Sequence, residues 1–84
     1  MSADELPGPA LLAHVIAVWQ DELALDPVAH DQDFFELGGH SLGAMRVAAR
    51  LGEELGCDLS LRAVFEHRTA AALAAELTRM GAKQ

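Results

Sequence analysis

One serine, placed directly after two glycines and a histidine, is the residue most suited to chemistry in this chain of 84 residues. Ser41 follows Gly38, Gly39 and His40. Glycine has no side chain that could obstruct an approaching enzyme, and it adopts positive φ values that other residues rarely reach. The pattern therefore predicts an exposed Ser41 hydroxyl on a turn, where a group could be attached. A plain helix N-cap is the alternative interpretation, because serine is among the preferred capping residues.

A helix is predicted to begin at or beside Ser41. Apolar residues recur at helical spacing after it, in the two rows Leu42, Met45, Ala49 and Ala44, Ala48, Leu51, Leu55. The predicted helix covers about residues 41–55, with Gly56 in the left-handed conformation just past its end. The first N–H groups of a helix lack partners and carry the positive end of its dipole, so they would stabilise a phosphate on Ser41.

A different chemistry is suggested by the pattern G-x-S-x-G at residues 39–43, which matches the nucleophile elbow of α/β-hydrolases. Asp58 and His67 follow Ser41 in the order of that catalytic triad. The elbow requires a buried strand before the serine and a parallel sheet beneath it. Residues 33–39 do not have the pattern of such a strand, so we do not favour a hydrolase.

Before Ser41, the sequence predicts one helix and then a long loop. The buried face of this helix is expected to carry Leu12, Val15, Ile16, Trp19 and Leu23. Residues 6–9 form an extended lead-in, and Asp26-Pro27 ends the helix. We expect Phe34 and Phe35 to anchor the loop with at least one buried ring, because removing such a side chain from water contributes about 1.5–3 kcal/mol.

After Gly56, the sequence predicts two further helices. A short helical turn over residues 62–66 would direct Val64 or Phe65 inward. Thr69 can cap the last helix, whose buried face is expected to carry Ala70, Leu73, Ala74 and Leu77. Residues 81–84 are expected to form a frayed tail. The predicted fold class is therefore all-α, a bundle of four helices with a long loop between the first two and a short third helix.

The composition indicates one small acidic domain with a modest core and a formal net charge of −7. Residues 1–42 contain eight acidic residues and no Lys or Arg, whereas residues 43–84 contain five acidic and six basic residues. Nucleic-acid binding needs clustered cations, so we exclude that class. The acidic half could steer basic partner enzymes toward the chain, or it could simply be a solvated face.

The sequence carries no signal for a membrane, for secretion, for a disulfide or for a metal. No apolar run approaches the roughly 20 residues that span a bilayer, and residues 1–5 are acidic, unlike a secretory signal. We therefore expect a cytoplasmic monomer that makes no membrane contact. Cys57 is the only cysteine and is expected to pack between helices as a small apolar side chain. The four histidines are scattered without metal-ligand spacing.

The segment Asp33–Leu42, with the sequence DFFELGGHSL, resembles the phosphopantetheine attachment motif of peptidyl carrier proteins. These are the thiolation domains of nonribosomal peptide synthetases. The resemblance extends over about residues 12–77 and includes Val18-Trp19, the segment 59–66 and Thr69.

Acyl carrier proteins of fatty-acid and polyketide pathways are similar too, but they usually have aspartate before the serine and a more acidic helix after it. His40, Arg46 and Arg50 favour the peptidyl branch. Two positions depart from the family pattern. Gly43 stands where a larger apolar residue is frequent, and Arg68 stands where proline commonly precedes the threonine.

The resemblance implies that a phosphopantetheinyl transferase, using coenzyme A and magnesium, moves 4'-phosphopantetheine onto the Ser41 hydroxyl. Gly39, His40 and Leu42 would border this attachment site. An adenylation enzyme would then load an aminoacyl group onto the thiol of the arm, and condensation, thioesterase or tailoring enzymes would use the thioester. The chain would thus be a substrate carrier and not an enzyme.

The resemblance also implies a surface for these partners, made of Leu42, Met45, Arg46, Val64 and Phe65. We expect a single carrier domain over residues 1–84 with an ordered core over about 10–80, and Met1 favours a freestanding protein. The alternatives are an acyl carrier protein of a polyketide or fatty-acid-like pathway, a noncatalytic helical adaptor without a prosthetic group, and an α/β-hydrolase fragment.

Overall fold

The computed structural model describes residues 8–82, and within this range it contains four helices and no strand. The helices are α1 (Pro9–Leu23), α2 (Ser41–Leu55), α3 (Leu61–Glu66) and α4 (Ala70–Arg79). An isolated bridge between Asp33 and Thr69 is the sole β-type pairing in this range. The prediction of an all-α bundle with a long first loop and a short third helix is confirmed.

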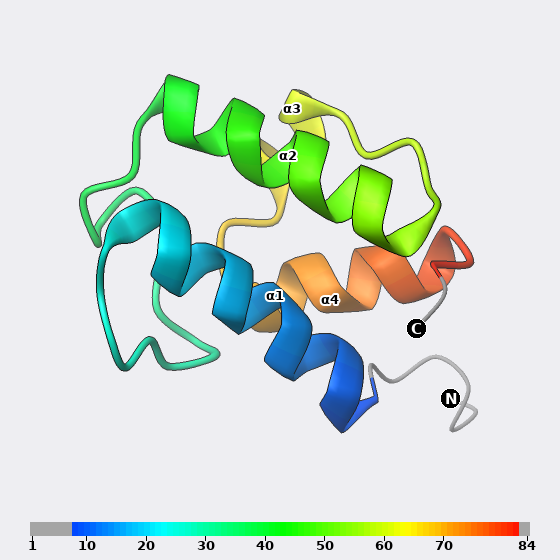
Figure 1. Ribbon diagram of the computed structural model, residues 1–84, viewed down its shortest axis with the longest axis horizontal. Helices are drawn as coiled ribbons and strands as arrows, with labels where there is room; N and C mark the ends of the chain where they lie inside the picture. Colours follow the sequence, from blue (N-terminus) through cyan, green and yellow to red (C-terminus); the bar gives the residue numbers. More distant parts are fainter. Residues whose placement is uncertain (1–7, 83–84) are drawn as a thin grey trace.

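The three longer helices surround one core, and α1 lies between α2 and α4 in the pattern of contacts. It packs against both, while α3 packs against α2 (Figure 1). The loop that joins α1 to α2 occupies one end of the molecule, so it brings residues 30–40 to the start of α2 (Figure 1). Ser41 therefore lies at the end of the bundle where this loop meets the first turn of α2.

The core is a single cluster of buried apolar residues contributed by the helices and the loops. It contains Leu11, Val15, Val18, Trp19, Val28, Phe34, Ala44, Val47, Ala48, Leu51, Leu55, Leu59, Val64, Ala70, Leu73, Ala74 and Leu77. The Trp19 and Phe34 rings are fully buried in this cluster and meet edge to face, with 5.1 Å between centroids. This confirms that one phenylalanine of the loop is buried, and it confirms the predicted buried face of α4.

The predicted face of α1 was partly wrong. Leu11 and Val18 are fully buried, whereas Leu12, Ile16 and Leu23 are only half-buried. The reason is that α1 contacts two helices at once, so its buried face is wider than one stripe and is centred differently. The helix also ends at Leu23, before Asp26-Pro27, with Ala24 in the left-handed conformation at φ 54°.

The predicted helix ends are confirmed at two other positions. Gly56 closes α2 at φ 66°, and the Thr69 hydroxyl accepts a hydrogen bond of 3.1 Å from Ala72 N–H at the start of α4. At Gly56 the backbone N–H donates to the Gly52 C=O, and at Thr69 the hydroxyl accepts from the Ala72 N–H. Both hydrogen bonds satisfy backbone groups that a helix end leaves without partners.

The expected frayed tail was wrong for the residues that can be described. Gly81 N–H donates to Thr78 C=O at 3.1 Å and Ala82 N–H donates to Leu77 C=O at 3.0 Å, which is a Schellman motif closing α4. Residues 83–84 of the tail lie outside the described residues. So do residues 1–5 and the first part of the extended lead-in, residues 6–7.

Within residues 8–82, no helix has both the length and the apolar character that crossing a membrane would require.

Candidate functional site

Ser41 is exposed and is the first residue of α2. His40 precedes it as the N-cap residue, in an extended conformation with φ −141° and ψ 179°, and no side chain caps this helix. The interpretation of Ser41 as a plain N-cap is therefore wrong, because that role would place its hydroxyl on the amides of the first turn. The hydroxyl is instead available to solvent at the start of the helix.

The two glycines before Ser41 are needed for different reasons. Gly38 has φ 104°, a conformation that favours glycine, and open space surrounds the position where a Cβ would be. Gly39 does not have positive φ. A Cβ at Gly39 would overlap the Phe34 ring, and the Gly39 N–H donates to the Phe34 C=O at 3.0 Å. Gly39 thus lets the buried ring lie directly against the backbone before Ser41.

Asp33 organises the loop that carries this ring. Its Oδ1 accepts hydrogen bonds from Phe35 N–H at 2.8 Å and from Glu36 N–H at 3.2 Å. Partial burial raises the pKa of the Asp33 carboxyl, but these two hydrogen bonds and Arg68 outweigh it and hold the pKa below its usual value. The carboxylate therefore acts as a fixed acceptor that shapes the turn leading to Gly38.

The surroundings of Ser41 fit a phosphodiester. The first turn of α2 has no acidic residue and no side-chain cap, and its backbone hydrogen bonds begin with Ala44 N–H donating to His40 C=O at 2.8 Å. The earlier N–H groups and the positive end of the helix dipole thus remain open to an anion. A phosphate on the Ser41 oxygen would meet no carboxylate of this turn.

A shallow hollow of about 390 Å³ lies on the preceding loop, lined by Asp31, Gln32, Asp33, Glu36 and Leu37. Its carboxylates make it unsuited to a phosphate, because like charges repel. Among residues 8–82, no three His, Cys, Asp or Glu side chains are grouped so that they could hold a metal ion. Cys57 is half-buried, and burial together with Asp58 raises the pKa of its thiol, which does not suit a reactive nucleophile.

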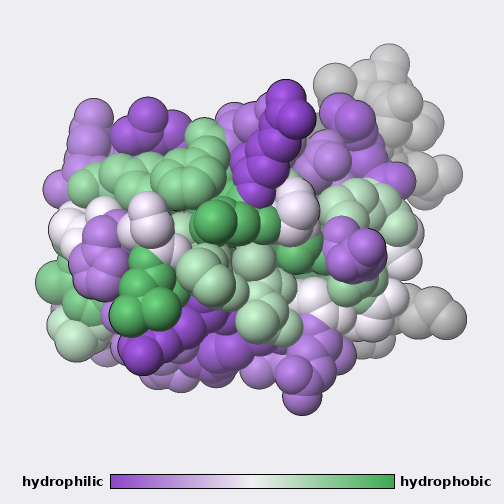
Figure 2. Space-filling model, turned by 90° about the horizontal axis from the view of Figure 1, so that it is seen from above, coloured by the Kyte–Doolittle hydropathy of each residue, from purple (hydrophilic) through white to green (hydrophobic). Residues whose placement is uncertain are grey.

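The exposed apolar side chains near Ser41 come from α2 and α3. Leu42 is 52% exposed, Met45 is 53% exposed and Phe65 is 42% exposed. Figure 2 looks onto this side of the molecule, where hydrophobic side chains gather between hydrophilic margins. Arg46 is exposed on α2 and has no ion pair with another described residue. As partner contacts, Leu42, Met45, Phe65 and Arg46 stay a prediction.

Val64 was wrongly placed in that surface. Its side chain is fully buried in the core, so it cannot meet a partner protein. Six residues give α3 fewer than two turns, and adjacent positions on such a helix point in different directions. Because Val64 faces the core, its neighbour Phe65 faces outward.

Sequence reasoning missed a cluster beside the site. Phe35 and Phe65 are stacked with 5.0 Å between centroids, the Arg68 guanidinium lies 4.9 Å from the Phe35 centroid, and Arg68 Nε lies 2.8 Å from Asp33 Oδ2. These residues are distant in sequence, so spacing could not reveal the contact. The one available signal was the unusual arginine before Thr69.

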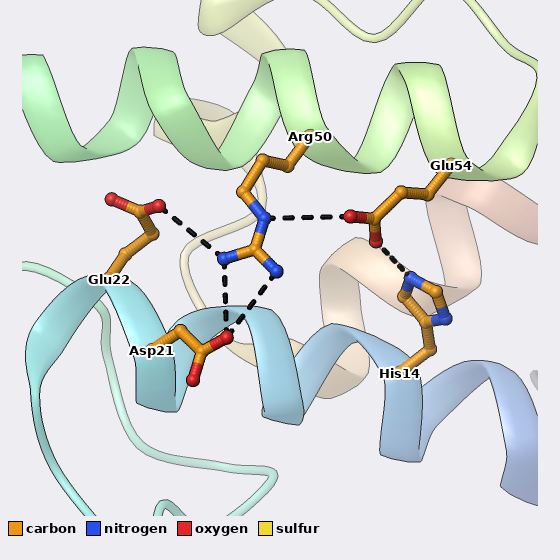
Figure 3. Close-up of polar contacts among 5 residues, drawn as sticks. All are labelled: His14, Asp21, Glu22, Arg50 and Glu54. Carbon is orange, nitrogen blue, oxygen red and sulfur yellow. Dashed lines mark hydrogen bonds and ion pairs between the residues drawn. The ribbon is translucent and has the colours of Figure 1, made fainter.

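A second polar cluster joins α1 to α2 (Figure 3). Arg50 lies between Asp21, Glu22 and Glu54, with nitrogen to oxygen distances of 3.4, 3.5 and 3.5 Å. His14 Nε2 lies 2.6 Å from the other oxygen of Glu54. These contacts are exposed or half-exposed, so they add modestly to the packing of the two helices.

The hydrolase alternative has no geometric support. His67 Nε2 lies 3.7 Å from Glu76 Oε1 of α4, so it faces that helix. Asp58 is exposed on the loop after α2. Within residues 8–82 there is no strand and no sheet beneath Ser41, and both are required by a nucleophile elbow.

Residues 13–77 match the family described as "Phosphopantetheine attachment site". One of the linear gramicidin synthase proteins of Brevibacillus parabrevis is 45% identical over 67 residues, which are 80% of this chain and 1% of that protein. Tyrocidine synthase 3 of the same organism is 41% identical over 73 residues, which are 87% of this chain and 1% of that protein. The chain thus spans about one hundredth of the length of these synthases.

Solved structures agree with the sequence relatives. BlmI, a type-II acyl carrier protein from Streptomyces verticillus involved in bleomycin biosynthesis, is 33% identical with a TM-score of 0.80, covering 83% of this chain and 84% of that one. A chain from the structure of the phosphopantetheine transferase Sfp with coenzyme A and a peptidyl carrier protein is 31% identical with a TM-score of 0.81, covering 88% and 96%. From its matched residues, its relatives and its four-helix fold, the chain belongs to the family of phosphopantetheine attachment domains.

Proposed function

We propose that this chain is a peptidyl carrier protein that holds aminoacyl or peptidyl intermediates in nonribosomal peptide biosynthesis. The observation that carries the proposal is that Ser41 is exposed as the first residue of α2, a helix whose N-terminus has no side-chain cap. The chain matches the phosphopantetheine attachment family over residues 13–77. The similarity to gramicidin and tyrocidine synthases supports peptide intermediates over the polyketide or fatty-acid alternative.

In this proposal Ser41 Oγ attacks the pyrophosphate of coenzyme A. A phosphodiester to 4'-phosphopantetheine forms as the pyrophosphate bond breaks, adenosine 3',5'-bisphosphate leaves, and the hydroxyl proton passes to a base of the transferase. The open N–H groups of the first turn of α2 stabilise the phosphate next to Ser41 Oγ. Gly38 leaves its side of the approach to the hydroxyl free of a side chain, and Gly39 makes room for the Phe34 ring. His40 and Leu42 border the site. When bound, the group supplies a thiol that forms thioesters with acyl groups.

The catalytic groups belong to the partners in this proposal, so the chain itself is a carrier and not an enzyme. A phosphopantetheinyl transferase modifies Ser41 and an adenylation enzyme loads the arm, after which condensation, thioesterase or tailoring enzymes use the thioester. Leu42, Met45 and Phe65 offer them an apolar surface, with Arg46 at its side. Such partners exchange rapidly, so a small interface suits turnover better than a large permanent one. A cytoplasmic location is part of the proposal.

Intact-protein mass spectrometry tests the attachment. The purified protein is incubated with coenzyme A, magnesium and a broad-specificity phosphopantetheinyl transferase. We expect the mass of one added phosphopantetheine on the wild type. Ser41→Ala should gain nothing, and Ser60→Ala should gain the same mass as the wild type, because Ser60 caps α3 instead.

A well-folded wild-type protein that gains no mass would contradict the proposal and favour the helical adaptor. Modification of Ser41→Ala would show that another residue is the acceptor. Loading of the modified protein by an adenylation enzyme with an amino acid and ATP would then separate the peptidyl carrier from an acyl carrier of another pathway.

A further inference from the structure

Arg68, on the link between α3 and α4, contacts the loop before Ser41 through both its side chain and its backbone. Its Nε lies 2.8 Å from Asp33 Oδ2 and its Nη2 donates to Asp33 Oδ1 at 3.3 Å. This is a two-point contact between a planar guanidinium and a carboxylate, the geometry that holds both groups in one orientation. The same guanidinium lies 4.9 Å from the centroid of the Phe35 ring.

Asp33 and Phe35 are the side-chain partners of Arg68, and Phe34 lies between them in the sequence. The backbone of Arg68 holds Phe34. Phe34 N–H donates to the Arg68 C=O at 2.7 Å, and Asp33 forms a bridge with Thr69. Arg68 therefore fixes three consecutive loop residues, Asp33 by a salt bridge, Phe34 by a hydrogen bond and Phe35 by a cation–π contact.

The Phe34 ring transmits this fixed position to the start of α2. A Cβ on Gly39 would overlap the ring, and a Cβ on Gly43 would lie 3.6 Å from it. The ring is fully buried and has Trp19 on another side. Because such a packed ring cannot shift without moving its neighbours, the position of Phe34 sets the position of the backbone on both sides of Ser41.

The contacts of Arg68 with Asp33, Phe34 and Phe35 are called the Arg68 clamp below. The Phe35 ring connects this clamp to α3. It stacks on Phe65 with an interplanar angle of 8°, and Phe65 is one of the exposed apolar residues near Ser41. The clamp thus joins the segment that carries Ser41 to α3. An ordinary exposed ion pair would add a little stability but would not connect these two parts.

We propose that Arg68 is a positioning residue for the modification of Ser41, holding the loop 33–39 so that Ser41 and Phe65 are presented together to the transferase. The proposal rests on the proposed function above. Arg68 acts through Asp33, Phe34 and Phe35 and does not itself touch the reacting oxygen.

Two measurements on the apo protein test this role. One is the hydrogen exchange of the Phe34 and Gly39 amides by NMR, and the other is the kcat/KM of phosphopantetheine transfer with a broad-specificity transferase. The variants are Arg68→Gln, which removes the salt bridge, and Arg68→Lys, which keeps the charge without the two-point contact. Arg79→Gln is the matched control, because it removes one exposed arginine and its ion pair with Glu76 at the far end of α4.

For Arg68→Gln we expect exchange of the Phe34 and Gly39 amides to be roughly fivefold faster and kcat/KM for transfer to fall about 3- to 10-fold. Arg68→Lys should lie between this variant and the wild type, and Arg79→Gln should match the wild type in both measurements. If Arg68→Gln does not fold, Arg68→Lys carries the comparison.

Three results would overturn the inference. Unchanged exchange and transfer in Arg68→Gln would remove any positioning role. Slower transfer with unchanged exchange would mean that Arg68 contacts the transferase directly, and faster exchange with unchanged transfer would mean that the clamp is only structural. Failure of the wild type to accept the group, with no difference from Ser41→Ala, would instead overturn the proposed function and this inference with it.

Discussion

At the residue scale, the geometry around Ser41 depends on three glycines that differ in what surrounds them. Gly38 needs its positive φ of 104°, while Gly39 is needed because the Phe34 ring fills the space of a side chain. Gly43 lies inside α2, where a Cβ would only make an ordinary contact of 3.6 Å with the same ring. The three positions therefore respond differently to the same substitution.

We predict opposite effects for alanine at Gly39 and at Gly43. Gly39→Ala should lower the free energy of unfolding by about 1–3 kcal/mol, because the new methyl group displaces a packed ring. Gly43→Ala should raise it by about 0.5–1 kcal/mol, because alanine favours a helix and its methyl group fits here. Urea unfolding followed by Trp19 fluorescence measures both, and equal changes in the two variants would contradict the packing argument.

At the element scale, α2 separates its two faces clearly. Ala44, Val47, Ala48, Leu51 and Leu55 are buried in the core. Leu42 and Met45 remain more than half exposed within about one turn of Ser41. Leu42 and Met45 contribute little to the core and lie beside Ser41, so they are suited to the proposed contacts with partner enzymes.

We predict that Leu42→Glu and Met45→Glu each lower the kcat/KM of aminoacyl loading by roughly 10-fold or more, while the circular dichroism of the helices stays unchanged. A charge at the centre of an apolar contact is desolvated without a partner, which weakens binding. Ala17→Glu is the control, since it adds the same charge at an exposed position of α1. Normal loading of both α2 variants would remove these residues from the partner surface.

At the scale of the whole molecule, acidic side chains with fixed partners connect segments that are distant in the chain. Asp33 connects the first loop to Arg68, and Glu54 connects α2 to His14 of α1. The hydrogen bond from His14 lowers the pKa of Glu54, partial burial opposes this, and Arg50 lowers it further. Both carboxyl groups therefore have a lower pKa in the folded protein than in the unfolded chain.

We predict that stability falls in acid because of these two groups. Between their folded and unfolded pKa values the unfolded chain binds more protons, so the free energy of unfolding rises with pH. Their contribution is complete above the unfolded values of about 3.9 and 4.3 and is lost as pH falls through the lower folded values. Urea unfolding between about pH 2 and 6 should show a smaller slope for Asp33→Asn and Glu54→Gln than for the wild type.

Glu53→Gln serves as the comparison for this pH series, since it removes a neighbouring exposed carboxylate of the same helix. Its slope should match that of the wild type. Equal slopes in all four proteins would mean that neither Asp33 nor Glu54 contributes to the pH dependence.

Much of the fold follows from local sequence patterns. The bounds of α2 at Ser41 and Leu55, the left-handed Gly56 and the Thr69 cap agree with the structure, because helix periodicity and capping depend on residues within a few positions of each other. The exposure of the Ser41 hydroxyl was also predictable from local features, because a serine that follows glycines at a helix start is a property of a short segment.

Which side chains meet across the chain became clear only from the packing of the folded molecule. Periodicity could not choose between Val64 and Phe65 in so short a helix, nor could it show that Phe34 excludes a side chain at Gly39. The clamp of Arg68 on Asp33 spans 35 positions of sequence, and no local pattern encodes such a pair. The helices, most of their ends and the exposed position of Ser41 at the start of α2 were predictable from the sequence, because these depend on near neighbours. The position of that serine relative to α3 and the loop depends on packing between distant segments.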